Sequence, residues 1–223
     1  MQKKTKFIIQ FFIKKNIQKL FSLFNLKIVR IDSLLSKNYT KLNYAFLDKK
    51  NELYLKYSKS QFGQDYLVNL LTKNKNPFFV EFGAVDGIQN SNTYYLEKVL
   101  KWKGILCEPS KKFSNELKKN RNCFIDLRCV YKSSNEKIYF TDVSNSMGAN
   151  GISKYLLKEN TYRPILNQYR VNTVSLYDLL IHYNAPFYID FLSIDTEGSE
   201  YDILKDFKFD KFSFGLILVE HAN

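Results

Sequence analysis

Short apolar runs alternate with amphipathic stretches along most of this 223-residue chain, and no other feature of the sequence constrains its fold as strongly. The alternation predicts helices at 64–71, 93–101, 113–119, 176–183 and 201–207, and strands at 78–84, 104–107, 123–130, 137–141, 171–174, 188–194 and 214–219. This spacing favours an α/β fold, with a mainly parallel sheet and helices on both faces. Such sheets bind ligands outside the carboxyl ends of their strands, so the residues after each strand are the first candidates for a site.

The composition is that of a globular protein, with 45% hydrophobic and 16% aromatic residues. We expect a main domain over residues 59–223, preceded by an extension over residues 1–58. The three cysteines, Cys107, Cys123 and Cys129, have no metal-binding spacing and lie in or beside apolar runs. This pattern favours buried thiols in a reducing compartment, and therefore a cytoplasmic protein.

The first 31 residues carry basic side chains and no acid, so part of the net charge of +12 is concentrated there. The apolar run 7–13 is too short to span a membrane, and no small-residue cleavage site follows it. Apolar residues at helical spacing predict a basic amphipathic helix: Ile9, Ile13, Ile17, Leu20 and Phe24. Two interpretations stay open. The helix binds an anionic membrane surface, which makes the protein peripheral on the inner face of the membrane, or it packs on the main domain or on a second copy of the chain.

The strand predicted at 78–84 ends in EFGAVDG, which places Glu81, Gly83, Ala84, Asp86 and Gly87 together. Small residues let backbone amides approach a ligand closely, and a carboxylate beside them can hold an ammonium group. The spacing E-x-G-x-x-x-G differs from the G-x-G-x-x-G of dinucleotide-binding proteins. A tight turn and a seat for a charged small molecule both fit this loop.

Acids also follow two other predicted strands. Glu108 comes directly after 104–107, where an acid can accept both hydroxyls of a ribose. Asp195 and Glu197 follow 188–194, and two carboxylates this close raise one pKa or recruit a cation.

Capping residues and a third acid complete the polar groups at the strand ends. Ser199 and Glu200 are candidates to cap the helix at 201–207. Glu220 and His221 follow the last strand and add an acid and a candidate base.

Six blocks of the sequence occur in the same order as in the FkbM-type S-adenosylmethionine-dependent methyltransferases: SQFGQD, FVEFGAVDGIQNSNTYYLE, WKGILCEPS, VNTVSLYDLL, IDFLSIDTEGSEYDIL and VEHAN. The chain resembles this family from about residue 60 onward. The resemblance implies a Rossmann-like class I methyltransferase sheet. It also implies methyl transfer to oxygen, on a sugar hydroxyl of a surface glycan such as lipopolysaccharide or of a glycolipid.

The resemblance further implies S-adenosylmethionine as the cofactor. Its methionine end would lie against the loop after the first strand, its ribose against Glu108 and its adenine near Asp126. The residues implied in cofactor binding are Gln64, Glu81, Gly83, Ala84, Asp86, Gly87, Ser91, Asn92, Glu108 and Asp126. Gln61 and Asp65 belong to the block of Gln64, which would fold over the cofactor.

For catalysis, Asp195 matches the acid beside the transferring methyl group, and Glu197, Glu220 and His221 would surround the acceptor. A sugar hydroxyl is a weak nucleophile at neutral pH, so a base or a cation that lowers its pKa would help. Asp195 is the first candidate base and His221 the second. Some related sugar O-methyltransferases use a divalent metal, and Asp195, Glu197 and Glu220 could supply oxygen ligands for Mg²⁺.

Two rival functions stay open. The charge of +12 would suit a nucleic-acid methyltransferase, but DTEG stands where exocyclic-amine enzymes carry an Asn/Asp-Pro-Pro-aromatic stretch. Its acids would also repel a phosphate backbone, so we expect no nucleic-acid partner. The other rival is a non-catalytic, cofactor-binding or membrane-attached module.

The chain departs from the family pattern after its last strand. Class I methyltransferases continue there with a helix and an antiparallel edge hairpin, whereas this sequence stops after VEHAN. We expect either a fragment, or a sheet edge covered by the N-terminal arm or by a partner. The whole interpretation requires Glu81, Glu108 and Asp195 to converge on one rim of the sheet.

Overall fold

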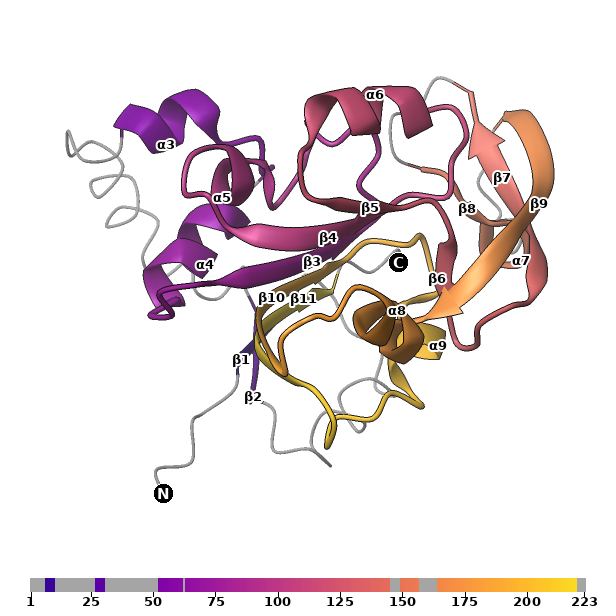
Figure 1. Cartoon of the computed structure of the whole chain (residues 1–223). Helices are drawn as coiled ribbons and strands as arrows, with labels where there is room; N and C mark the ends of the chain where they lie inside the picture. The colour runs from indigo at the N-terminus through magenta and orange to yellow at the C-terminus, as the bar shows by residue number, and fades with distance from the viewer. Residues whose placement is uncertain are drawn as a thin grey trace.

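The molecule has a mixed α/β fold built on a parallel sheet (Figure 1). The structure is a computed structural model and describes residues 7–10, 27–30, 52–61, 63–144, 149–156 and 164–219. Its main sheet has seven strands in the order β2-β1-β11-β10-β3-β4-β5, each parallel to its neighbours. These strands are β1 (Phe7–Gln10), β2 (Lys27–Arg30), β3 (Phe78–Phe82), β4 (Lys103–Cys107), β5 (Phe124–Asp126), β10 (Tyr188–Ile194) and β11 (Ser213–Val219). The predicted α/β class with a mainly parallel sheet is confirmed.

Helices cover both faces of this sheet. One face carries α3 (Glu52–Tyr57), α4 (Gln64–Leu71), α5 (Tyr94–Lys98) and α6 (Ser114–Asn120), and the other carries α8 (Leu176–His182) and α9 (Glu200–Leu204) (Figure 1). Within β3, Phe78, Val80 and Phe82 pack in the core of α8 and α9, while Phe79 packs in the core of α4 and α5. Because both faces are covered, β3 is apolar throughout except at Glu81.

The strand order reverses between β3 and β10. Strands β3, β4 and β5 extend the sheet in one direction, and the chain then returns to place β10 and β11 on the other side of β3. In open α/β sheets this reversal leaves a crevice outside the carboxyl ends of the two strands, where ligands bind.

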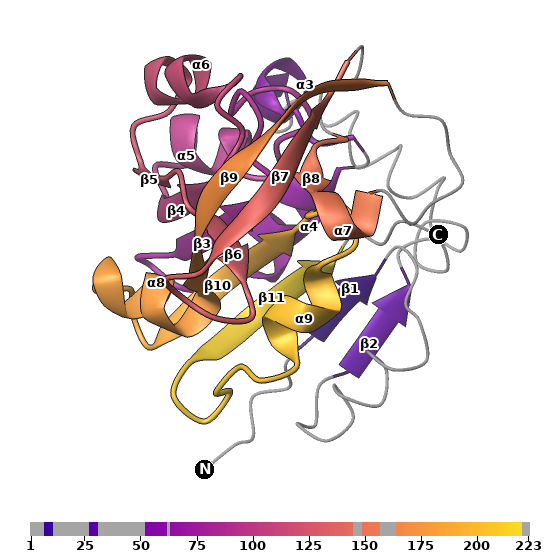
Figure 2. The same ribbon diagram turned by 90° about the vertical axis from the view of Figure 1, so that its right-hand side faces the viewer.

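A second, smaller sheet lies between β5 and α8 in the chain. Its order is β6-β9-β7-β8, made of β6 (Cys129–Tyr131), β7 (Lys137–Val143), β8 (Gly151–Ile152) and β9 (Ile165–Ser175), and the short helix α7 (Ser153–Leu156) follows β8. Figures 1 and 2 place this sheet beside the carboxyl ends of β3 and β4. The prediction of one strand over 123–130 was wrong, because the chain leaves the main sheet after Asp126 and enters the second sheet at Cys129.

The N-terminal arm contributes strands to the main sheet. β1 pairs with β11 from Phe7↔Leu216 to Gln10↔Val219, and β2 pairs with β1. The predicted amphipathic helix is therefore wrong for Phe7–Gln10 and Lys27–Arg30, and the rest of residues 1–31 lies outside the described residues. Of the alternatives left open for the β11 edge, the structure shows coverage by the arm, which adds parallel strands there instead of an antiparallel hairpin.

Among the residues that the structure describes, no helix combines the length and the apolar character needed to cross a bilayer.

Candidate functional site

A cavity of about 460 Å³, counting space open to solvent, lies where the strand order reverses. Its floor comes from the ends of β3 and β4, and one side comes from the loop after β10. The second sheet closes the opposite side with apolar groups. The lining includes Phe82, Gly83, Val85, Cys107, Glu108, Asp195, Thr196, Ser199, Cys129, Val130, Phe140 and Ile152.

Strand register brings three predicted site residues to one level beyond the sheet. Phe82 pairs with Cys107 on β4 and with Ile194 on β10, so the next residues are Gly83, Glu108 and Asp195. All three line the cavity. Glu108 and Asp195 therefore converge as expected.

Gly83 allows these strand ends to approach each other. Its φ is +76°, and a Cβ built there would lie 2.0 Å from the backbone oxygen of Asp195. Its N–H donates to the carbonyl of Cys107 at 3.1 Å, and the Asp195 N–H donates to the carbonyl of Phe82 at 3.3 Å. Any side chain here would push β10 away from β3, so the position requires glycine.

Glu108 presents a buried carboxylate to the cavity. Its Oε2 accepts from the Val85 N–H at 2.9 Å and its Oε1 from the Ser110 N–H at 2.8 Å. Burial raises the pKa of Glu108 to about 7, the charge of Asp142 adds to this rise, and the two N–H bonds oppose it. Each carboxylate oxygen has a further lone pair, so the group can accept hydrogen bonds from two ligand hydroxyls.

Asp86 and Gly87 shape the loop after β3 and are not among the residues that line the cavity. The Oδ1 of Asp86 accepts from the N–H groups of Ile88 and Gln89 at 2.9 and 2.8 Å, which closes a turn. Gly87 has a φ of +79°, and a Cβ there would lie 2.6 Å from Cγ of Arg121. Ala84 is buried in the core on the α4 and α5 side.

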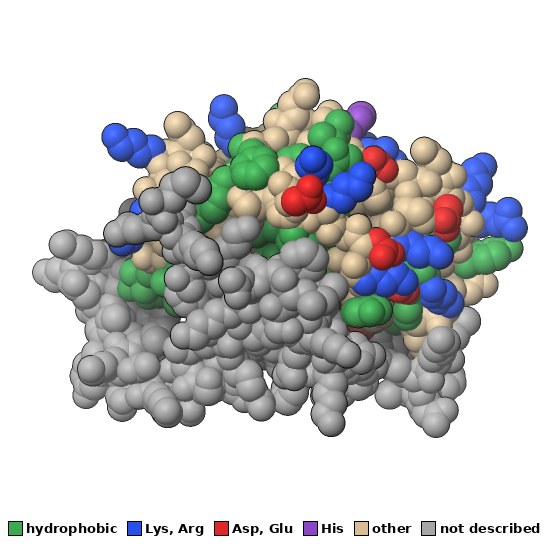
Figure 3. Space-filling model, turned by 90° about the horizontal axis from the view of Figure 1, so that it is seen from below, with side chains coloured by type: hydrophobic (Ala, Val, Ile, Leu, Met, Phe, Trp, Pro, Cys, Tyr) green, Lys and Arg blue, Asp and Glu red, His purple; other side chains and the backbone are tan. Residues whose placement is uncertain are grey.

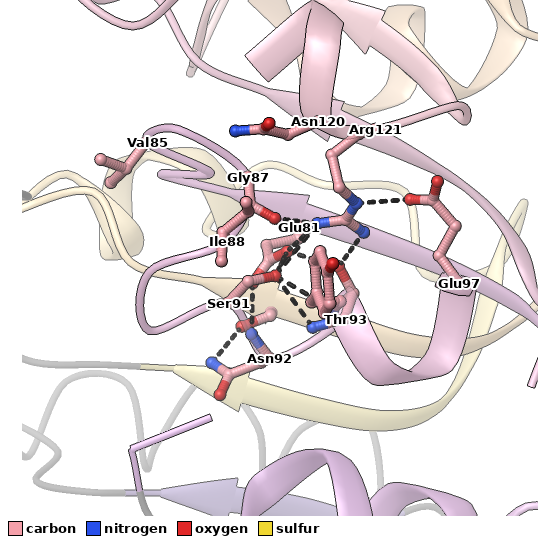
Figure 4. A network of polar contacts seen from close by, with 12 residues as sticks. Glu81, Val85, Gly87, Ile88, Ser91, Asn92, Thr93, Glu97, Asn120 and Arg121 are labelled. Atoms are coloured by element: carbon pink, nitrogen blue, oxygen red, sulfur yellow. Dashed lines mark hydrogen bonds and ion pairs between the residues drawn. The ribbon is translucent and has the colours of Figure 1, made fainter. Parts of the chain in front are cut away.

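Glu81 lies within β3, and its side chain forms hydrogen bonds with the loop before α5 (Figure 4). Its carboxylate accepts from Ser91 Oγ at 3.0 Å, from the Asn92 N–H at 2.8 Å and from Thr93 Oγ1 at 2.5 Å. The side chain is buried and is not among the residues that line the cavity. Direct contact of Glu81 with a cofactor stays a prediction.

Arg121 completes this network, and no sequence pattern pointed to it. Its Nε donates to Glu97 at 2.5 Å, its Nη1 to the carbonyl of Gly87 at 2.9 Å and to Ser91 Oγ at 3.1 Å, and its Nη2 to Thr93 Oγ1 at 2.9 Å (Figure 4). Burial alone would raise the pKa of Glu97, but the Arg121 charge lowers it overall. A single arginine after an amphipathic helix resembles a solvated residue in sequence, so only the tertiary contacts reveal it.

The block before β3 lies against the same loop. Asn92 donates from Nδ2 to Ser193 Oγ at 3.1 Å and accepts from Ser60 Oγ at 3.0 Å, and Ser60 also bonds the Gln64 side chain. Asp65 points into the core instead, where it accepts from Tyr54 OH and Ser58 Oγ.

The loop after β10 is built around Glu200. Its Oε1 accepts from the N–H groups of Thr196 and Gly198, both at 3.0 Å. The expected cap from the Ser199 side chain does not form, because Ser199 Oγ donates to Thr196 Oγ1 at 2.9 Å. Glu197 has a left-handed φ of 55° and packs against Gly151 of the second sheet.

The other predicted site residues lie elsewhere. Asp126 forms a bidentate pair with Arg128, with contacts of 2.6 to 3.1 Å, and does not line the cavity. Glu220 and His221 fall outside the described residues. Within the described part of the chain, no group of three or more His, Cys, Asp or Glu side chains could hold a metal ion.

The geometry suits a small molecule with hydroxyl groups. A buried acceptor, Glu108, faces a crevice with apolar walls, and a second carboxylate, Asp195, stands across it at the end of β10. Groups held between the two would be shielded from bulk water.

A family model described as the methyltransferase FkbM domain matches residues 81–223. No curated protein and no solved structure matches the chain.

Proposed function

The chain belongs to the FkbM methyltransferase family, and from this premise we propose that it is an S-adenosylmethionine-dependent O-methyltransferase that acts on a sugar hydroxyl of a glycan or glycolipid. The observation that carries the proposal is the buried Glu108 carboxylate, held by two backbone N–H groups at the strand-order reversal. Gly83, in the loop beside it, lines the same cavity at the same level of the sheet.

Glu108 and the Gly83 loop offer hydrogen-bonding groups that match those of S-adenosylmethionine. Glu108 would accept the two ribose hydroxyls, and the backbone of the Gly83 loop would face the amino-acid end. The bound cofactor supplies a methyl group already activated on a sulfonium. The protein therefore has to align the acceptor hydroxyl and exclude water.

Asp195 is the candidate base. It lies at the same level as Glu108 beyond the sheet and lines the same cavity. Its carboxylate would take the proton of the acceptor hydroxyl as the oxygen gains its methyl group. The walls at Val130, Phe140 and Ile152 would keep water from competing for that position.

The proposed acceptor and location follow from the family resemblance and from the charge of the N-terminal arm. Sugar hydroxyls are the acceptors that the family resemblance implies, and a basic arm before Asp32 suits a glycolipid on an anionic membrane. A role of Mg²⁺ would need Glu220 beside Asp195 and Glu197.

Isothermal titration with S-adenosylmethionine and S-adenosylhomocysteine tests cofactor binding. We expect Glu108→Gln to weaken binding by about 10- to 100-fold, because the amide keeps one acceptor oxygen and loses the other, and one hydrogen bond to a charged group contributes about 1.5–3 kcal/mol. Glu116→Gln, at an exposed position of α6, is the matched control. Circular dichroism of both variants establishes that they are folded. Absence of binding by the wild-type protein would refute the proposal and favour a non-catalytic module.

A methyl-transfer assay with glycan extracts and with RNA, each with and without a chelator, tests the acceptor and the metal. With S-adenosylmethionine that carries a labelled methyl group, we expect the label to appear in the glycan. Asp195→Asn should lose this transfer and still bind S-adenosylhomocysteine. Label in RNA would replace the proposed acceptor by the nucleic-acid alternative.

A further inference from the structure

A second cavity of about 740 Å³, counting space open to solvent, lies on the far side of Pro109 from the first. Pro109 lines both cavities. The second is formed by the loop after β4, the loop after β5 and the middle of β9, which contributes Arg170, Val171 and Asn172. The site described above uses none of its cationic side chains.

The lining of this cavity is rich in cations. It contains Lys111, Arg128 and Arg170, and no carboxylate among the described residues that form it. Asp142 is the acid bonded to two neighbouring residues, Ser110 and Tyr169, but it does not line the cavity. Its carboxylate accepts from Ser110 Oγ at 2.7 Å and from Tyr169 OH at 3.0 Å.

Arg128 has a fixed orientation. Its Nε and Nη2 donate to the two carboxylate oxygens of Asp126, at 2.6 to 3.1 Å, and these bonds raise its pKa. A guanidinium has five N–H donors. Among the described residues, no hydrogen bond uses the two donors of Arg128 Nη1, so they can donate to a ligand. The pair as a whole is neutral, and Arg128 serves as an oriented donor.

Lys111 and Arg170 supply uncompensated positive charge. Lys111 Nζ lies 4.6 Å from the ring centroid of Tyr169, and Arg170 Cζ lies 5.2 Å from that of Tyr139. Among the described residues, neither forms a salt bridge. The rings hold both cations in place without neutralising them.

Some other cations among the described residues are paired with acids. Lys205 Nζ lies 2.7 Å from Asp202, and Lys154 lies 3.6 Å from the same carboxylate. On the described part of the face seen in Figure 3, some Lys and Arg side chains lie beside Asp and Glu side chains, and others have no acid next to them. A hollow lined by Lys132 and Lys208 also contains Asp178 and Asp206, whereas the cavity beside Pro109 has three cations and no lining acid.

We propose that this cavity binds the phosphate group of a phosphate ester or diphosphate. Cationic donors without a lining carboxylate, including the guanidinium of Arg170, match the oxygens of a phosphate. Two uncompensated cations favour a dianion over a monoanion. Pro109, Leu127 and Val171 offer apolar surface to the organic part of the molecule. The proposal does not depend on methyl transfer.

Titration with pyrophosphate tests the site, with Lys111→Gln/Arg170→Gln as the variant. Because both residues are exposed, we expect the double change to weaken binding by only about 5- to 20-fold. We also expect wild-type binding to weaken as NaCl is raised. Lys118→Gln/Lys119→Gln removes the same charge from exposed positions of α6 and should leave binding unchanged.

Sedimentation with phosphatidylglycerol vesicles, run on the same proteins, distinguishes a lipid headgroup from a free phosphate. The proposal is supported if the Lys111→Gln/Arg170→Gln variant loses binding to pyrophosphate or to the vesicles while the Lys118→Gln/Lys119→Gln variant keeps it. The probe whose binding is lost then identifies the source of the phosphate. No binding of either probe, or equal loss in both variants, overturns it. S-adenosylhomocysteine titration of the variant should match the wild type, which separates this site from the cofactor cavity.

Discussion

The affinity for S-adenosylhomocysteine should rise with pH between 6 and 8, because Glu108 must ionise to accept ribose hydroxyls. Burial raises the pKa of this carboxyl to about 7 in the free protein. Ligand hydroxyls donate to the ionised form and lower the pKa in the complex. The protein therefore loses a proton from Glu108 as the ligand binds.

The magnitude follows from the ionised fraction. With a pKa of about 7, about 9% of Glu108 is ionised at pH 6 and about 91% at pH 8. If only the ionised form binds, the association constant increases by about tenfold across this interval. Proton release falls from about 0.9 to about 0.1 per ligand over the same range.

Isothermal titration in buffers of different ionisation enthalpy measures both quantities. 5′-Methylthioadenosine is a useful second ligand, because it keeps the ribose and lacks the titratable amino-acid end. Glu108→Gln should flatten the profile, and Glu116→Gln should preserve it. Burial raises the pKa of Asp65 to about 6, so this group also titrates within the pH range of the experiment. Asp65→Asn must therefore preserve the pH dependence of binding too.

An affinity that is flat, or that rises toward pH 6, would refute the reasoning about Glu108. The same holds if Glu108→Gln retains the wild-type dependence, because the titrating group would then lie elsewhere.

Three further predictions concern stability, measured by urea unfolding. Gly83→Ala should lower the free energy of unfolding by more than about 2 kcal/mol, since it combines a positive φ with a Cβ 2.0 Å from the Asp195 carbonyl oxygen. A decrease below about 0.5 kcal/mol would contradict the close approach of β3 and β10. Arg121→Met should cost about 3–5 kcal/mol because it leaves buried carboxylates unpaired, whereas Lys119→Met should be nearly neutral. Asp65 has a folded pKa above its ordinary value, so its stabilisation is lost as pH rises through about 6; the wild type should lose about 1 kcal/mol more than Asp65→Asn between pH 5 and 7.

The two central strands of the main sheet, β3 and β10, were predictable because they are buried on both faces. Both are mainly apolar, interrupted by Glu81 in β3 and by Asp190 and Ser193 in β10, and their bounds lie close to those predicted. β9 was predicted only at 171–174, since its first half is exposed and carries no apolar periodicity. The split between β5 and β6 also escaped the pattern, because periodicity does not tell which sheet an apolar run joins.

The N-terminal arm shows the limit of helical periodicity. Its apolar residues recur at a spacing that fits a helix, yet FIIQ and KIVR are rich in β-branched residues and pair along β11 and β1. An open parallel edge stabilises an added strand through backbone hydrogen bonds that no local pattern encodes.

The candidate site shows why two glutamates at neighbouring strand ends differ in role. In sequence, Glu81 and Glu108 each follow an apolar run, and both fit a ligand contact equally well. The register pairs Glu81 with Leu106, so Glu108 lies two residues, or about 7 Å, farther along the strand direction. Glu81 is therefore enclosed by the Ser91–Thr93 loop and Arg121, whereas Glu108 reaches past the sheet to the cavity. Register between strands distant in sequence, more than residue type, decides which acid can meet a ligand.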